Sequence, residues 1–291
     1  MRRRTFLQSG LAASLGGPLL AAVKQEKLDA AAALLAKAAR NGQLGAAALY
    51  VRHGKHVFAR SFGASRSADD MFLLASISKP MSAAALMTLY DQGKFRLDDA
   101  VKKFIPEFSG ASRDTITIRQ LLTHVSGLPD QLPENQVLRK RHAGLSEFVD
   151  RVIRTPLLFE PGSRYRYSSM AILLASEVAH RISGKGFLRF IDEVLFQPLK
   201  MNRSVLGLGK FKLEEMMPSQ VEAAARESGS GDPMARDWDW NSSYWRVFGA
   251  PWGGRARLGS GRGSLLQRVP SPRRQVDAVR DGSPDATQSQ P

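Results

Sequence analysis

Apolar and polar positions follow two different spacings along this chain, and each spacing predicts one kind of element. Apolar residues three and four positions apart indicate a helix, whereas short apolar runs between turn residues indicate strands. Residues 28–40 show the first spacing and predict an amphipathic helix. Residues 46–51 and 56–62 show the second, and the turn residues 52–55 between them predict a β-hairpin.

Helical spacing dominates the middle of the chain. Residues 76–93 carry Ala83, Leu86, Met87 and Tyr90 on one helical face, so they predict a long helix. Further helices are predicted over residues 98–104, 118–123, 145–155, 167–183 and 187–194. Nothing repeats at a fixed period, which excludes a repeat architecture. The pattern therefore predicts a helix and a hairpin followed by a mainly helical region.

The composition allows a packed core and excludes several chemistries. The chain has 291 residues, of which 43% are hydrophobic and 24% charged, enough for one large domain or two modest ones. It has no cysteine, which excludes disulfides, thiolate catalysis and Cys-ligated metal sites. The histidines form no His-x-His or His-Glu-x-x-His pattern, and there is no Walker loop or dinucleotide fingerprint. We therefore expect neither a metal nor a cofactor.

The net charge of +15 could indicate an anionic partner. Much of this charge lies at the ends, because residues 1–22 carry three Arg and no acidic residue, and residues 255–291 carry seven Arg and three Asp. The rest of the chain has no long cationic run and no base-stacking motif of the RNA-binding kind. We therefore expect no nucleic-acid partner.

Both ends differ in composition from residues 23–254, which we predict to be the folded domain. Within residues 1–22, the run at residues 3–7 resembles a twin-arginine export signal and predicts a periplasmic or extracellular bacterial protein; a disordered basic N-terminus is the alternative. The apolar part is too short and Gly-rich for a stable membrane anchor. Residues 255–291 have no aromatic residue and no periodicity, which indicates a disordered tail or a frameshifted reading of a structured C-terminus.

Ser76 and Lys79 stand three residues apart at the start of the predicted long helix. Residues at this spacing share a helical face, so the hydroxyl and the amine can approach each other. A neutral amine can take the hydroxyl proton and so activate the serine as a nucleophile. The alternative is that Ser76 caps the helix and that Lys79 is a solvated helix residue.

Tyr167 and Ser169 follow a Pro-Gly turn at residues 161–162 and begin another predicted helix. A Tyr at a helix N-terminus near a Lys can have its phenol pKa lowered, and it can then exchange a proton with a serine. Ser169 can hydrogen-bond an amine or a substrate carbonyl. The alternative is a packed Tyr beside a capping Ser.

Two further features have structural interpretations. We interpret His124 as a residue that bonds backbone groups and fixes its loop, rather than as a general base. The aromatic residues within 238–252 either line a cleft or pack as a loop on the body of the domain.

Taken in order, these stretches resemble the serine β-lactamase-related family, which includes class C β-lactamases, penicillin-binding DD-peptidases, D-aminopeptidases and esterases. The family's first motif matches residues 76–79, and its second, Tyr-x-Asn or Tyr-x-Ser, matches residues 167–169. Its Leu-Leu-Thr-His-x-Ser-Gly-Leu-Pro stretch matches residues 121–129. The similarity runs from about Leu28 to Gly254. It implies an α/β fold of the β-lactamase and penicillin-binding-protein type, in which a helical region packs on an antiparallel sheet.

The resemblance also implies the role of each site residue. Ser76 would be the acylated nucleophile, Lys79 would assist its deprotonation, and Tyr167 would be the general base. Ser169 would position Lys79 or the substrate, and the oxyanion hole would use the backbone N–H of Ser76 and one from a C-terminal strand. The implied reaction is a two-step acyl transfer on a small amide or ester, namely a β-lactam, a D-amino-acid peptide or an ester. The expected partner is thus a small-molecule or peptide substrate.

The family's third motif is Lys or His, then Thr, Ser or another residue, then Gly, and its Ser-Gly and Thr-Gly forms have no match in this sequence. Thr-Gly does not occur, and no Ser-Gly follows a basic residue. The family places this motif and about three strands after a position like residues 251–254. We therefore predict an incomplete sheet that consists of the N-terminal hairpin, with weakened or absent activity unless a partner supplies the missing strands. The alternatives to an enzyme are a catalytically inactive binding protein and a degenerate fragment.

Overall fold

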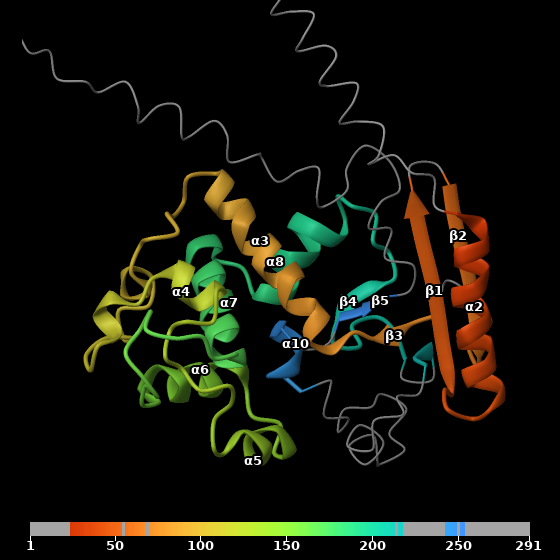
Figure 1. The fold of residues 1–291 in the computed structure, drawn as a ribbon. Helices are drawn as coiled ribbons and strands as arrows, with labels where there is room; N and C mark the ends of the chain where they lie inside the picture. The colour runs from red at the N-terminus through yellow and green to blue at the C-terminus, as the bar shows by residue number, and fades with distance from the viewer. Residues whose placement is uncertain are drawn as a thin grey trace, which may run out of the picture.

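The structure, a computed structural model, places one helix and one hairpin beside a body of helices (Figure 1). It describes residues 24–53, 56–67, 70–212, 215–217, 242–248 and 251–253. The first elements are α2 (Gln25–Arg40), β1 (Ala46–His53) and β2 (His56–Gly63). The others are β3 (Phe72–Leu73), η2 (Ala75–Ser78), α3 (Lys79–Asp91), η3 (Val101–Lys103), η4 (Arg113–Thr115), α4 (Ile118–Leu122), α5 (Asn135–Lys140), α6 (Leu145–Arg154), α7 (Ser169–Ser183), α8 (Phe187–Ile191), η5 (Asp192–Phe196), β4 (Ser204–Leu206), α10 (Trp245–Phe248) and β5 (Pro251–Gly253).

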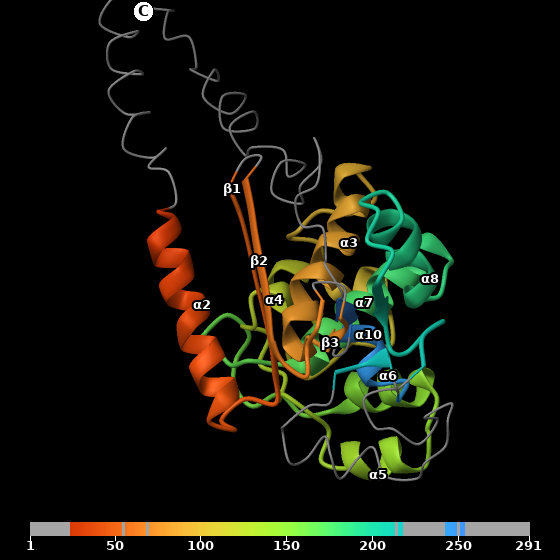
Figure 2. The same ribbon diagram turned by 90° about the vertical axis from the view of Figure 1, so that its right-hand side faces the viewer.

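The predicted N-terminal helix and hairpin are confirmed. Strands β1 and β2 pair antiparallel in a regular register from Ala46 opposite Gly63 to His53 opposite His56. Helix α2 packs against both strands, and Phe58 is the buried apolar residue of the hairpin. Figure 2 shows the hairpin edge-on, with α2 on one side and the helical body on the other. This arrangement gives a helix layer, a sheet layer and a second, thicker helix layer.

Among the described residues, the hairpin forms a two-stranded sheet of its own, as expected, but a second sheet was not predicted. A second antiparallel sheet of three short strands, in the order β3-β5-β4, lies at the side of the helical body, where β4 packs against α10 and η5. Each of these strands is two or three residues long. A strand this short shows no alternation of period two, which is why the hydrophobic pattern did not predict it. The second sheet matters for the site because β3 leads directly into η2.

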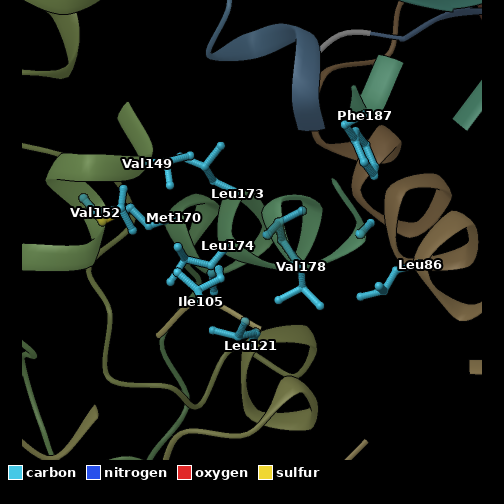
Figure 3. Packing of buried hydrophobic residues seen from close by; sticks show 14 of the residues in the cluster. Leu86, Ile105, Leu121, Val149, Val152, Met170, Leu173, Leu174, Val178 and Phe187 are labelled. Atoms are coloured by element: carbon cyan, nitrogen blue, oxygen red, sulfur yellow. The ribbon is translucent and has the colours of Figure 1, made fainter. Parts of the chain in front are cut away.

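Helix α7 forms the centre of the core (Figure 3). Its sequence is apolar almost all round, so most of its residues from Ser169 to Ala179 are buried. Ser168 caps its start, and Gly184, with a φ of 67°, ends it in the left-handed conformation that glycine adopts without strain. Helix α7 packs directly against five other helices, α3, α4, α6, α8 and α10. The elements around the site are therefore held by one contiguous core.

Two predicted helices differ in detail from the structure. The predicted helix over residues 76–93 is confirmed in its length, but Ser76 lies in the 3-10 helix η2, and α3 begins at Lys79. The predicted helix over residues 98–104 is wrong, because η3 covers residues 101–103 alone. Asp98 and Asp99 use their carboxylates to bind Arg119 and the backbone N–H of Arg96, and these local bonds compete with helix formation.

Both predicted terminal segments, residues 1–22 and residues 255–291, lie outside the described residues. Within the described part of the chain, no helix combines the length and apolarity that crossing a bilayer requires.

Candidate active site

Ser76 lies where strand β3 turns into the 3-10 helix η2. Ala75, the preceding residue, has a φ of 45°, in the left-handed region that non-glycine residues adopt rarely. Local hydrogen bonds hold this turn: Ser78 Oγ donates to the carbonyl oxygen of Ala75 at 2.6 Å, and the Ile77 N–H donates to that of Leu74 at 3.1 Å. Ser76 itself is exposed to solvent. Backbone strain beside an accessible hydroxyl is a feature found at functional sites.

Lys79 reaches back from the first position of α3 to Ser76. Its Nζ donates to Ser76 Oγ at 3.0 Å, and the residue is 5% exposed. The alternative in which Lys79 is a solvated helix residue is therefore wrong. The alternative in which Ser76 caps the helix is also wrong, because Ser78 is the residue that precedes α3. The hydroxyl and the buried amine form one hydrogen-bonded pair, as the spacing of three residues predicts.

Tyr167 adds a third group to this pair from a distant part of the chain. Its hydroxyl lies 2.8 Å from Ser76 Oγ and is hydrogen-bonded to it, across 91 residues of sequence. Lys79 Nζ also lies 5.1 Å from the centroid of the Tyr167 ring. Helices α3 and α7 pack against each other, and this packing brings the segment before α7 to the start of α3. The serine oxygen thus accepts hydrogen bonds from both proton-carrying groups.

His124 borders the same site, in the loop after α4. Its Nδ1 accepts the backbone N–H of Ser168 at 3.2 Å, and its ring centroid lies 4.8 Å from that of Tyr167. The interpretation that His124 binds backbone groups is confirmed, although its partner belongs to the start of α7. Burial lowers the pKa of His124, and the nearby positive charge of Lys79 lowers it further. Both effects favour the neutral form of its imidazole.

Ser169 is the first residue of α7 and is 2% exposed. Its backbone N–H donates to a carboxylate oxygen of Asp130 at 2.8 Å. Its side chain interacts with the phenol of Tyr244, a buried residue that precedes α10. Burial raises the pKa of this phenol, and hydrogen bonds with Asn135 and Ser169 lower it in part. The structure therefore places the buried Ser169 side chain beside the Tyr244 phenol. Its predicted role toward Lys79 or a substrate stays a prediction.

Tyr244 is a residue of this region that the motifs did not identify. It is fully buried, and its ring lies 5.0 Å from the Phe148 ring between centroids. Burial raises the pKa of its phenol, and the charge of Asp130 adds to that rise. Of the two interpretations of the aromatic residues within 238–252, packing on the body of the domain is therefore correct for Tyr244. Residues 238–241 lie outside the described residues. Only its position among these aromatic residues could have indicated Tyr244 from the sequence.

The described residues of the site have side chains without the arrangement of a metal site. In that part of the chain, no group of three or more His, Asp or Glu side chains has the arrangement of a metal site. The site offers the Ser76 hydroxyl as a nucleophile, with the Lys79 amine and the Tyr167 phenol both within hydrogen-bonding distance of its oxygen atom. This constellation can support acyl transfer through a serine ester.

Comparison with known proteins identifies the class that this fold and site define. The family model described as beta-lactamase matches residues 28–256, and the chain belongs to this family. The fold is accordingly the α/β fold of β-lactamases and penicillin-binding proteins. In solved structures, the chain is similar to a D-amino acid amidase from Ochrobactrum anthropi SV3, with a TM-score of 0.62 and 22% identity over 76% of this chain and 65% of that one. This likeness shows the fold alone.

Two further relatives have names that state an activity. The chain is 34% identical over 180 residues to esterase EstB from Burkholderia gladioli, which covers 54% of this chain and 46% of that protein. It is 25% identical to a D-stereospecific amidohydrolase from Streptomyces sp., with a TM-score of 0.51 over 60% of this chain and 55% of that one. The chain spans about half the length of the curated relatives it matches.

Proposed function

We propose that this protein is a serine hydrolase that cleaves a small ester or amide through a covalent acyl-enzyme. The observation that carries the proposal is that Ser76 Oγ lies 3.0 Å from Lys79 Nζ and 2.8 Å from the Tyr167 hydroxyl. A serine needs such a partner to lose its proton as it attacks. The esterase and amidohydrolase relatives support the substrate class, because both names describe hydrolysis of an acyl bond.

The proposed reaction has two steps. In the first, Ser76 Oγ attacks the carbonyl carbon, its proton passes to Tyr167 or Lys79, and the alcohol or amine leaves with that proton. One of these two groups must be deprotonated when the attack occurs. In the second, water attacks the acyl carbon, the carboxylic acid leaves, and a proton returns to Ser76. The backbone N–H of Ser76 is the proposed first donor of the oxyanion hole, and the donor from a C-terminal strand stays a prediction.

The first test is covalent labelling of Ser76. A fluorophosphonate probe is expected to label the wild-type protein and to leave Ser76→Ala unlabelled, with the modified peptide identified by mass spectrometry. Ser146→Ala is the matched control, because Ser146 is exposed on α6 and takes no part in the site. Labelling of Ser76→Ala at the wild-type rate would show that another residue is the nucleophile.

A second candidate function follows from the missing third motif. Because no basic residue precedes Ser-Gly or Thr-Gly, the sequence predicts that the group which the family uses beside the nucleophile is missing. A binding protein that keeps the pocket without turnover would show no labelling but a cooperative thermal transition. A degenerate fragment would show no transition at all. Turnover of p-nitrophenyl acetate, a D-amino acid amide and a penicillin separates the substrate classes if the enzyme is active.

We also propose that residues 1–22 direct export. The support is the arginine pair followed by a short apolar stretch. Residues 1–22 fused to a reporter that is active only in the periplasm are expected to export it, and replacement of Arg3 and Arg4 by Lys is expected to abolish that export. Equal export by both fusions would exclude the twin-arginine interpretation.

A further inference from the structure

The segment that carries Tyr167 is held on both sides by one residue, His124. The carbonyl oxygen of His124 accepts the backbone N–H of Arg166 at 2.9 Å, and its Nδ1 accepts the backbone N–H of Ser168 at 3.2 Å. The two bonds bracket Tyr167 as a pair of strand hydrogen bonds would, with the imidazole nitrogen in the place of a second carbonyl. The backbone on either side of Tyr167 is therefore fixed by one neighbour.

The ring of His124 also holds the ring of Tyr167. The two ring centroids lie 4.8 Å apart with their planes tilted by 35°, and Tyr165 contacts the imidazole edge-on at 6.0 Å. Tyr167 is 36% exposed, so a large part of its surface lies in solvent. The contact with His124 thus limits the rotation of a phenol whose oxygen must stay near Ser76 Oγ.

The conformation of His124 itself is unusual. Its φ of 59° lies in the left-handed region, where a non-glycine residue costs free energy. This conformation lets one residue present both its carbonyl oxygen and its imidazole to the same segment. Local strain that persists at a functional site indicates a geometric requirement there.

We propose that His124 is a positioning residue that holds the Tyr167 phenol against Ser76 while its own imidazole is neutral. The reason is that Nδ1 can accept the Ser168 N–H only when it carries no proton. Protonation turns Nδ1 into a donor that faces another donor, and it places a second cation near Lys79. Both effects release the segment that carries Tyr167. The kinetic part of this proposal rests on the proposed hydrolase function.

The charges around His124 set the direction of its pH dependence. Burial and the positive charge of Lys79 lower its pKa, whereas the hydrogen bond from Ser168 and the carboxylate of Asp130 raise it. The lowering prevails, so the folded protein binds this proton at a lower pH than the unfolded chain does. The hydrogen bond from the Ser168 N–H to His124 Nδ1 therefore stabilises the fold fully above the ordinary pKa of about 6.5. This stabilisation is lost as the pH falls through the lowered pKa.

The kinetic test compares His124→Asn with His124→Gly. Both residues tolerate a positive φ, but Asn keeps a side-chain acceptor near the position of Nδ1 and does not titrate, whereas Gly keeps none. The rate at which fluorophosphonate labels the wild-type protein is expected to decrease as the pH falls below 6.5, and His124→Asn is expected to lose this acid limb. His124→Gly is expected to be slower than His124→Asn by about tenfold or more at every pH. An unchanged acid limb in His124→Asn, or equal rates in the two variants, would overturn the proposal.

The second test does not depend on activity and uses the wild-type protein. In ¹⁵N-histidine NMR spectra, assigned by the signal lost in His124→Asn, Nδ1 is expected to be unprotonated at pH 7.5. The protection of the Ser168 amide proton, taken relative to the intrinsic exchange rate at each pH, is expected to fall as His124 becomes protonated. A proton on Nδ1 at pH 7.5, or a Ser168 amide insensitive to this titration, would refute the positioning role of His124. If the wild type reacts with no probe but passes the NMR test, the hydrolase proposal fails and the positioning contact stands.

Discussion

At the scale of single residues, the site depends on one oxygen atom that contacts two different proton carriers. Lys79 meets Ser76 because the two lie on one turn of the chain, and Tyr167 meets it because α3 and α7 pack together. The amine is buried, whereas the phenol is partly exposed. The two partners of Ser76 therefore differ in how firmly their surroundings hold them, and Tyr167 depends more on its neighbours.

Replacing Tyr167 by Phe tests the proposed general base. The variant keeps the ring that packs on His124 but loses the oxygen 2.8 Å from Ser76 Oγ. Acylation of Ser76 is expected to slow by about 10²–10⁴-fold, with little change in the melting temperature. Tyr165→Phe is the matched control, since Tyr165 also contacts His124 but is 66% exposed. Equal rates for the two variants would remove Tyr167 from the mechanism.

At the scale of elements, the start of α7 connects the site to the core. Ser168 Oγ accepts the Ala171 N–H at 3.0 Å and donates to the carbonyl oxygen of Pro129 at 2.7 Å. Asp130 accepts the backbone N–H of Ser169 through its carboxylate and that of Met170 through its carbonyl oxygen. The loop after α4 therefore supplies partners to N–H groups that the first turn of any helix leaves unpaired. One loop thereby fixes both the helix start and the site beside it.

Removal of the Ser168 cap is expected to destabilise the protein. Ser168→Ala deletes two hydrogen bonds of a fully buried hydroxyl and leaves the Pro129 carbonyl oxygen without that donor. The free energy of unfolding is expected to fall by about 1–3 kcal/mol, measured by urea denaturation. Ser146→Ala, at an exposed position of α6, is expected to change it by less than about 0.5 kcal/mol. Equal effects of the two substitutions would contradict the importance of the cap.

At the scale of the whole molecule, burial differs between the part formed by α2 and the hairpin and the helical body. Helix α2 contains no buried residue, and its Leu34 is 71% exposed, whereas α7 is buried along most of its length. The hairpin packs mainly against α2. The part formed by α2 and the hairpin is therefore held by less apolar contact than the helical body that carries Ser76, Lys79 and Tyr167.

Native-state hydrogen exchange is expected to reveal this difference. Regions with few buried apolar contacts open at a lower free energy than the core does. The amides of α2 and of the hairpin are expected to exchange well before those of α7, measured by mass spectrometry of peptides over a time course. Equal protection of α2 and α7 would mean that the two parts unfold as one cooperative unit.

The sequence by itself determined the elements and contacts that depend on neighbouring residues. The amphipathic N-terminal helix, the hairpin and the long helix after Ser76 follow from periodicity over about ten to twenty residues. The approach of Ser76 to Lys79 follows from their spacing, since three residues make about one turn. The short strands β3, β4 and β5 were missed because two or three residues carry no measurable period.

The tertiary structure alone decided which distant groups meet. The bonds from His124 to Ser168 and from Tyr167 to Ser76 span 44 and 91 residues, and no local pattern specifies such pairs. Tyr244 reaches Ser169 in the same way, from a segment that precedes α10. These contacts form because burying the apolar faces of α3, α4 and α7 against one another leaves one arrangement of the loops at their ends.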